Sequence, residues 1–214
     1  MKILIFSGSL RKESLNKKLC HVVTDIFQKN NLAEVHFVDL QPLNIPVYDG
    51  DFETSQGIPA GIMNLGKQIT AADAIVICTP EYNGSIPGSL KNVVDWLSRE
   101  KPVPLAGKQM LLLAASPGAL GGTRSLWHTR QPFEVLSTFV YPEMMGVPKA
   151  HENILPNNTL ADAKLQANLE RLVKDFAAHA KKFMQATAAQ DAHDSMPAQA
   201  RSTTAGGTTA SPQH

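Results

Sequence analysis

Residues 3–16, ILIFSGSLRKESLN, join four apolar residues to a segment rich in serine, glycine and charge. Four consecutive apolar residues predict a strand buried on both faces, and the change of composition after Phe6 marks its carboxyl end. Apolar residues then recur at helical spacing, at Leu15, Leu19, Val22, Val23 and Ile26. The stretch therefore predicts a strand, a loop and a helix, which is the first unit of an alternating α/β protein.

The loop between this strand and this helix carries side chains that suit an anion. Ser9, Arg11, Ser14 and Asn16 supply two hydroxyls, a guanidinium and an amide near the expected helix N-terminus. Free backbone N–H groups and the positive end of the helix dipole favour negative charge there. The loop lacks the Lys-Ser/Thr of a Walker A motif, and no G-x-G-x-x-G follows a strand. Taken alone, the stretch fits a phosphate-binding loop or an ordinary turn with serine capping.

The alternation of strands and helices continues along the chain. Further strands are expected at 34–39, 74–78, 110–115 and 138–141, and further helices at 62–72, 88–98, 126–136 and 160–184. Residues 40–59 contain Pro, Asp and Gly without periodicity and are expected to form a surface excursion. The pattern predicts a flavodoxin-like, doubly wound, five-stranded parallel sheet with helices on both faces. Ligands of such sheets bind outside the carboxyl ends of the strands.

The composition changes after residue 184, where Ala, Thr, Gln, Ser, Gly and Pro dominate. Such a segment cannot bury enough apolar surface to offset its chain entropy. We therefore expect a folded domain over 1–184 and a disordered, low-complexity tail over 185–214. Its composition favours a solvated extension over a partner-binding or processing element.

Length and charge limit the class of protein. The 214 residues, 43% of them hydrophobic, suffice for one core, and a formal net charge of +1 argues against a dedicated nucleic-acid surface. No apolar run could span a bilayer, and the first strand stands where a signal peptide would be, so a cytoplasmic protein without membrane partners is expected. Cys20 and Cys78 lack metal-type spacing and suit reduced, packed thiols better than a disulfide or a metal site.

Two later loops complete the pattern. PEYNGS at 80–85 follows the third predicted strand, and SPGALGG at 116–122 follows the fourth. Together with residues 8–16, these loops resemble, in order and spacing, the NADPH-dependent FMN reductase family. This flavodoxin-like group includes chromate, quinone and azo-dye reductases. The resemblance covers residues 1–184.

The resemblance implies cofactor-binding roles for residues of all three loops. The FMN phosphate is assigned to Ser9, Arg11, Ser14 and Asn16. The isoalloxazine ring is assigned to Pro80, Glu81, Tyr82, Asn83 and Gly84, and its other side to the third loop, which includes Ser116 and Gly118. Taken singly, Glu81 also fits a solvated turn charge and Tyr82 a core aromatic. No catalytic side chain is assigned, because N5 of the flavin carries the chemistry.

The resemblance also implies an activity and an assembly. The activity is ping-pong hydride transfer from NADPH or NADH through FMN to quinones, free flavin, azo compounds or chromate. A homodimer or homotetramer is expected, with Trp127 at an interface, on the substrate side or packed against the sheet, and Trp96 in the core. A flavodoxin-like electron carrier and a non-enzymatic binding module are the alternatives. Arg11 and the near-neutral charge favour the reductase over the carrier.

Overall fold

The computed structural model describes residues 1–195, and a parallel sheet forms the centre of residues 1–180. Within the described residues its strands run in the order β2-β1-β3-β4-β5, and β6 pairs with β4. The strands are β1 (Lys2–Ser7), β2 (Glu34–Val38), β3 (Ala74–Thr79), β4 (Gln109–Ala115), β5 (Phe139–Val140) and β6 (Met145–Val147). The central strands β3 and β4 are wholly buried, as runs of consecutive apolar residues require in a sheet covered on both faces.

The predicted doubly wound parallel sheet is confirmed, with one difference at its edge. The expected strand at 138–141 is shorter, and β6 takes over further along the same edge of β4. Phe139 pairs with Gln109 at the start of β4, whereas Met145 pairs with Leu113 near its end. Pro142 lies between the two strands and has no N–H for the ladder, so the edge position is split in two.

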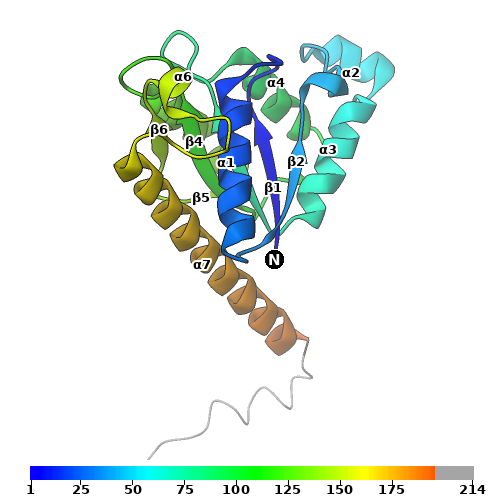
Figure 1. The fold of residues 1–214 in the computed structure, drawn as a ribbon. Coiled ribbons are helices and arrows are strands. Elements are labelled where there is room, and N and C mark those ends of the chain that lie inside the picture. The colour runs from blue at the N-terminus through cyan, green and yellow to red at the C-terminus, as the bar shows by residue number, and fades with distance from the viewer. Residues whose placement is uncertain (196–214) are drawn as a thin grey trace, which may run out of the picture. The chain divides into compact units, whose positions relative to one another are not determined.

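Helices cover both faces of the sheet (Figure 1). The main helices are α1 (Leu15–Lys29), α3 (Ala60–Ala71), α4 (Gly88–Leu97), α5 (Thr123–Val135) and α7 (Ala163–Asp194). Ile3 and Ile5 pack into one core with α1 and the part of α7 up to Ala180. Leu4 and Phe6 face the other core, formed with α3, α4 and α5. The alternation follows from the pleat of β1, whose successive side chains point to opposite faces.

The excursion at 40–59 is more regular than its sequence indicated. It contains a 3₁₀ helix, η1 (Gln41–Leu43), and a short helix, α2 (Gly50–Gln56). The Asp49 side chain caps α2 by accepting a 2.8 Å hydrogen bond from the Asp51 N–H. Two side chains of α4, Asn92 and Trp96, each donate a 2.8 Å hydrogen bond to the Pro46 carbonyl. A helix of this length is too short to show periodicity, but its capping aspartate was a readable signal.

Two further helices differ from the sequence-based expectation. The last helix was expected to end near residue 184, whereas α7 continues to Asp194. Residues 185–194 are rich in Ala and Gln, which have high helix propensity and need no apolar stripe. The rest of the predicted tail, 196–214, lies outside the described residues. A short helix, α6 (Ala150–Asn153), also follows β6.

Two other expectations concern the cysteines and the membrane. Cys20 and Cys78 are both free and buried, which confirms the prediction of packed thiols. Burial raises the pKa of the Cys78 thiol well above its ordinary value, and the neighbouring Cys20 adds to the shift. Among residues 1–195, no helix combines the length and the apolar character needed to cross a bilayer.

Candidate functional site

The three loops singled out in the sequence meet at the carboxyl ends of β1, β3 and β4. These strands are adjacent and parallel, so the loops that follow them emerge at one edge of the sheet. Between them lies a cavity of about 100 Å³. Its lining consists of Ser9, Arg11, Ser14, Leu15, Asn16, Pro80, Glu81, Tyr82, Ala115, Ser116 and Pro117. Of the predicted cofactor residues, Asn83, Gly84 and Gly118 lie outside this lining.

The first loop passes close to β3. The Gly8 N–H donates to the Cys78 carbonyl at 2.9 Å, and a Cβ on Gly8 would lie 3.0 Å from Oγ1 of Thr79. The Ser9 hydroxyl is buried and accepts from the Arg11 N–H at 3.3 Å. Ser14 caps α1, its hydroxyl accepting from the N–H groups of Asn16 and Lys17. The loop is thus held in shape by its own serines.

Several donors of the first loop remain available to a ligand. Among the described residues, the N–H groups of Glu13, Ser14 and Leu15 have no hydrogen-bond partner. Within the same residues, the Arg11 guanidinium has no partner either, and no acidic residue stands in the first turn of α1. A phosphate dianion accepts several hydrogen bonds and is stabilised at a helix N-terminus. The donors of the first loop therefore fit a flavin phosphate.

Asn16 differs from the other residues of the first loop, because its side chain is bonded to the protein. Its Nδ2 donates to the Ala115 carbonyl at 2.9 Å, and its Oδ1 accepts from the Ala115 N–H at 2.8 Å. Only 2% of the residue is exposed. The side chain thus joins the start of α1 to the end of β4. No sequence signal indicated this contact, which spans 99 positions.

The second loop contains a tight turn. Tyr82 and Ser85 exchange backbone hydrogen bonds of 3.1 Å, and Asn83 and Gly84 between them have φ values of 52° and 75°. Positive φ at both central residues is typical of a type I′ turn, for which Asn-Gly is the preferred sequence. Tyr82 is 46% exposed, so the interpretation of this residue as a core aromatic is wrong. The turn places an aromatic side chain at the cavity.

Glu81 connects the second loop to α5. Its carboxylate accepts from the Arg124 backbone N–H at 3.1 Å and from Nε of Arg124 at 2.8 Å, and also pairs with Nη2. Burial on its own would raise the pKa of Glu81, but the hydrogen bonds and charge of Arg124 and the Ser125 N–H hold it below its ordinary value. The side chain is only 9% exposed, so the interpretation as a solvated turn charge is wrong. Sequence reasoning missed Arg124 as its partner.

The third loop packs tightly against β6. Gly121 and Gly122 have φ values of 63° and 87°, and a Cβ on Gly121 would lie 2.7 Å from the Gly146 carbonyl carbon. The Ser116 N–H donates to the Val147 carbonyl at 3.2 Å, and its hydroxyl accepts from the Gly118 N–H at 3.2 Å. Gly121 is required because no side chain fits between the loop and β6, and a Cβ on Gly122 would lie 2.9 Å from that of Ala114 in β4.

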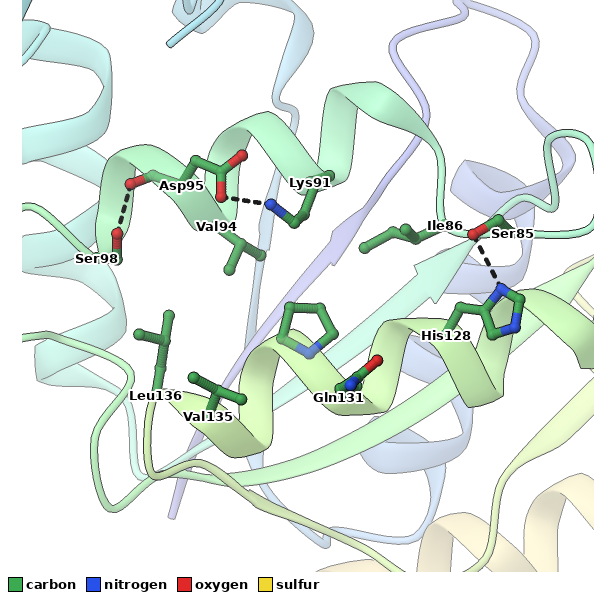
Figure 2. A pocket seen from close by; sticks show the side chains of 11 residues that line it. Ser85, Ile86, Lys91, Val94, Asp95, Ser98, His128, Gln131, Val135 and Leu136 are labelled. Atoms are coloured by element: carbon green, nitrogen blue, oxygen red, sulfur yellow. Dashed lines mark hydrogen bonds and ion pairs between the residues drawn. The ribbon is translucent and has the colours of Figure 1, made fainter. Parts of the chain in front are cut away.

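A larger hollow of about 620 Å³ lies between α4 and α5 (Figure 2). Its apolar lining consists of Ile86, Val94, Pro132, Val135 and Leu136. Lys91 pairs with Asp95 at 2.6 Å, and Nδ1 of His128 lies 2.9 Å from the Ser85 hydroxyl. None of the predicted cofactor residues lines this groove. The predicted phosphate donors thus lie in a different part of the domain from this groove between α4 and α5.

The two tryptophans have different environments. Trp96 is fully buried, which confirms its expected place in the core. Trp127 on α5 is 62% exposed, so packing against the sheet does not account for it. Val135, two turns further along the same helix, is 77% exposed. Contiguous apolar patches on a surface, rather than single exposed side chains, are typical of interaction sites.

Comparison with known proteins gives consistent matches. Residues 1–152 match the family described as NADPH-dependent FMN reductase. A quinone reductase of Escherichia coli (strain K12) is 40% identical over 152 residues, which cover 68% of this chain and 77% of that protein. The solved flavoenzyme NAD(P)H:(acceptor) oxidoreductase of Paracoccus denitrificans superposes with a TM-score of 0.73 at 26% identity, covering 85% of this chain and 98% of that one. An archaeal flavodoxin shares the fold. It superposes with a TM-score of 0.54 at 11% identity, covering 85% of this chain and 99% of that one.

Proposed function

Because the chain belongs to the NADPH-dependent FMN reductase family, we propose that it passes hydride from NADPH or NADH through FMN to a quinone. Its membership makes it an oxidoreductase with FMN as cofactor and NAD(P)H as hydride source. The single observation that supports the site is the cavity where three loops meet beside unpaired donors at the start of α1. The E. coli relative, a quinone reductase, supports the choice of acceptor.

The residues around the cavity would hold the cofactor by its two ends. Ser9, Arg11 and Ser14 would bind the phosphate, together with the free N–H groups that precede α1. The turn at 82–85 would meet the ring edge with its main chain, and the exposed Tyr82 would offer a flat contact to the ring or to a planar substrate. The chemistry that FMN supplies when bound is hydride acceptance and donation at its N5 atom.

The chain's own contribution is to bind and to orient. None of the residues lining the cavity is a histidine or cysteine, and its one carboxylate, Glu81, is engaged with Arg124. Hydride transfer needs close approach and alignment of donor and acceptor more than a protein base. Rigid loops at the carboxyl ends of three buried strands suit that requirement.

We include a ping-pong order of substrates in the proposal. NADPH or NADH would bind first and leave, and the acceptor would then use the same place. Free flavin, azo compounds and chromate are further acceptors of the same reaction.

Spectroscopy of the purified protein tests the proposal. Flavin absorption bands that bleach on anaerobic addition of NADPH, and return on addition of a quinone, would support it. Bands that persist with NADPH would favour the electron carrier. A colourless protein that does not take up added FMN would contradict the proposal. Steady-state rates with quinone, azo dye and chromate would then rank the acceptors, and parallel lines in double-reciprocal plots would support the ping-pong order.

The assembly and location are also part of the proposal. The exposed Trp127 on α5 and the exposed Val135, which lines the groove between α4 and α5, support a homodimer or homotetramer. Light scattering coupled to size exclusion measures the mass of the assembly. If this surface is the interface, W127A should lower that mass. Two free, buried thiols support a cytoplasmic location, since reducing compartments keep cysteines unpaired.

A further inference from the structure

Two of the predicted cofactor residues use their side chains to join one loop to another. We propose that Asn16 and Glu81 are positioning residues, which attach the first and second loops to the two ends of the third loop. In this arrangement the flavin site is assembled before the flavin arrives. The inference rests on the proposed function, because it concerns the same cavity.

Asn16 provides the first connection. Its amide bonds to both backbone groups of Ala115, at 2.9 Å from Nδ2 and 2.8 Å to Oδ1. Ala115 is the last residue of β4 and directly precedes the third loop. At 2% exposure, Asn16 has little surface to offer a ligand. A buried amide that satisfies two backbone groups holds their positions, because leaving either group unpaired costs free energy.

Glu81 provides the second connection, at the other end of the third loop. The residue preceding α5 is Gly122, which has no side chain and makes no capping hydrogen bond. Glu81 supplies that cap from 43 positions earlier in the chain, through the backbone N–H and Nε of Arg124. A carboxylate at a helix N-terminus also interacts favourably with the helix dipole. The start of α5 and the second loop are therefore held together.

The third loop is itself held firmly between these two connections. Gly121 packs against the backbone of Gly146 and Pro148, and the Lys149 N–H donates to the Gly118 carbonyl at 3.2 Å. The first and second loops are thus tied to one rigid segment. Loss of either connection should let a loop move relative to the others, and it should weaken contacts to every part of the flavin.

Positioning residues and phosphate ligands differ in their effect on a flavin that lacks the phosphate. A phosphate ligand contributes to FMN affinity and little to riboflavin affinity, since riboflavin has no phosphate. A positioning residue contributes to both. We therefore expect N16A to weaken the binding of FMN and of riboflavin by similar factors, each roughly tenfold. R11Q should weaken FMN by roughly the same factor and leave riboflavin nearly unchanged.

The chain offers a matched control for each variant. Asn92 makes the same pair of bonds as Asn16, with its Nδ2 2.8 Å from the Pro46 carbonyl and its Oδ1 2.8 Å from the Tyr48 N–H, away from the cavity. Glu53 pairs with Arg99 as Glu81 pairs with Arg124. N92A and E53Q should lower stability and leave both flavin affinities unchanged. E81Q should weaken the binding of both flavins.

Fluorescence titration with FMN and with riboflavin measures these affinities. Hydrogen exchange of 8–16 and 80–85 in the flavin-free protein measures the mobility of the first and second loops. Equal weakening of FMN and riboflavin binding by N16A and E81Q, with faster exchange at 8–16 in N16A and at 80–85 in E81Q, would support the inference. Weakening of FMN alone would make Asn16 a phosphate ligand and overturn its positioning role. A loss of stability with unchanged affinities would also overturn it. Should N16A fail to fold, E81Q carries the test, because glutamine keeps the shape of the side chain.

The wild-type protein tests the proposed function separately. If it binds neither flavin, the proposed function fails, and hydrogen exchange alone decides the inference. Unchanged exchange at 8–16 in N16A and at 80–85 in E81Q would then overturn the connection between the loops.

Discussion

The carboxylate of Glu100 packs against Gly66, in the space that a methyl group on α3 would fill. Its Oε1 is buried and has no hydrogen-bond partner among the described residues. Burial raises the pKa of Glu100, and the charge of Lys67 opposes the shift only in part. Burying a charged carboxylate without a hydrogen-bond partner costs free energy. The packing of the surrounding residues, and not a bond of its own, therefore keeps Glu100 in this place.

Replacement of Glu100 by glutamine should stabilise the protein at neutral pH. A folded-state pKa above the unfolded value of about 4.3 means that stability falls as the pH rises from that value through the folded pKa. E100Q does not ionise, so its advantage over the wild type should be present near pH 7 and vanish below about pH 4. Urea unfolding of both proteins across this range measures the difference. An advantage that is independent of pH would contradict the assigned cause.

The Glu81 carboxylate should show the opposite pH dependence. Its pKa is lowered in the fold, so the stability it contributes is present above about pH 4.3 and is lost as the pH falls through the folded pKa. We expect E81Q to cost about 1 kcal/mol near neutral pH, since solvent around the exposed Arg124 screens the pair. The cost should shrink on acidification. Unfolding free energies of E81Q and wild type at matched pH values provide the test.

Gly121 should tolerate no side chain. At φ 63° an alanine is strained, and its Cβ would meet the backbone of Gly146 and Pro148. Gly107 is a matched control, because it has φ 77° but no heavy atom lies within 4 Å of the place that a Cβ would take. We expect G107A to cost about 1 kcal/mol and G121A about 2–4 kcal/mol with loss of FMN uptake. Equal thermal shifts for the two variants would argue against the tight contact with β6.

Substitutions at Ser14 should separate helix capping from anion binding. S14A removes the hydroxyl that accepts from Asn16 and Lys17, so it should cost about 1 kcal/mol of stability and also weaken FMN. S14D keeps a good cap and adds a negative charge near the expected phosphate. It should therefore retain stability while weakening FMN at least as much as S14A. Calorimetry and FMN titration on both variants measure the two effects, and tight FMN binding by S14D would place the phosphate elsewhere.

Much of the fold could be predicted because buried parallel strands have a simple requirement. Residues such as Ile75, Val76 and Ile77 face helices on both sides, so the strand must be apolar at every position. The shorter elements were less predictable. The split between β5 and β6 depends on the backbone around Pro142, and α2 depends on the hydrogen bonds that Asn92 and Trp96 make to Pro46.

The sequence by itself determined the long buried strands, the order of the three loops and the family that they resemble. Those features depend on local composition and spacing, which are written along the chain. The tertiary structure decided what Asn16 and Glu81 do, because their partners Ala115 and Arg124 lie 99 and 43 positions away. In sequence, an amide or carboxylate that would contact a phosphate or a flavin ring cannot be distinguished from one that bonds to a backbone group. The register of β3 beside β4 and the position at which α5 begins bring one partner to Asn16 and one to Glu81. No local sequence pattern indicates which partner that is.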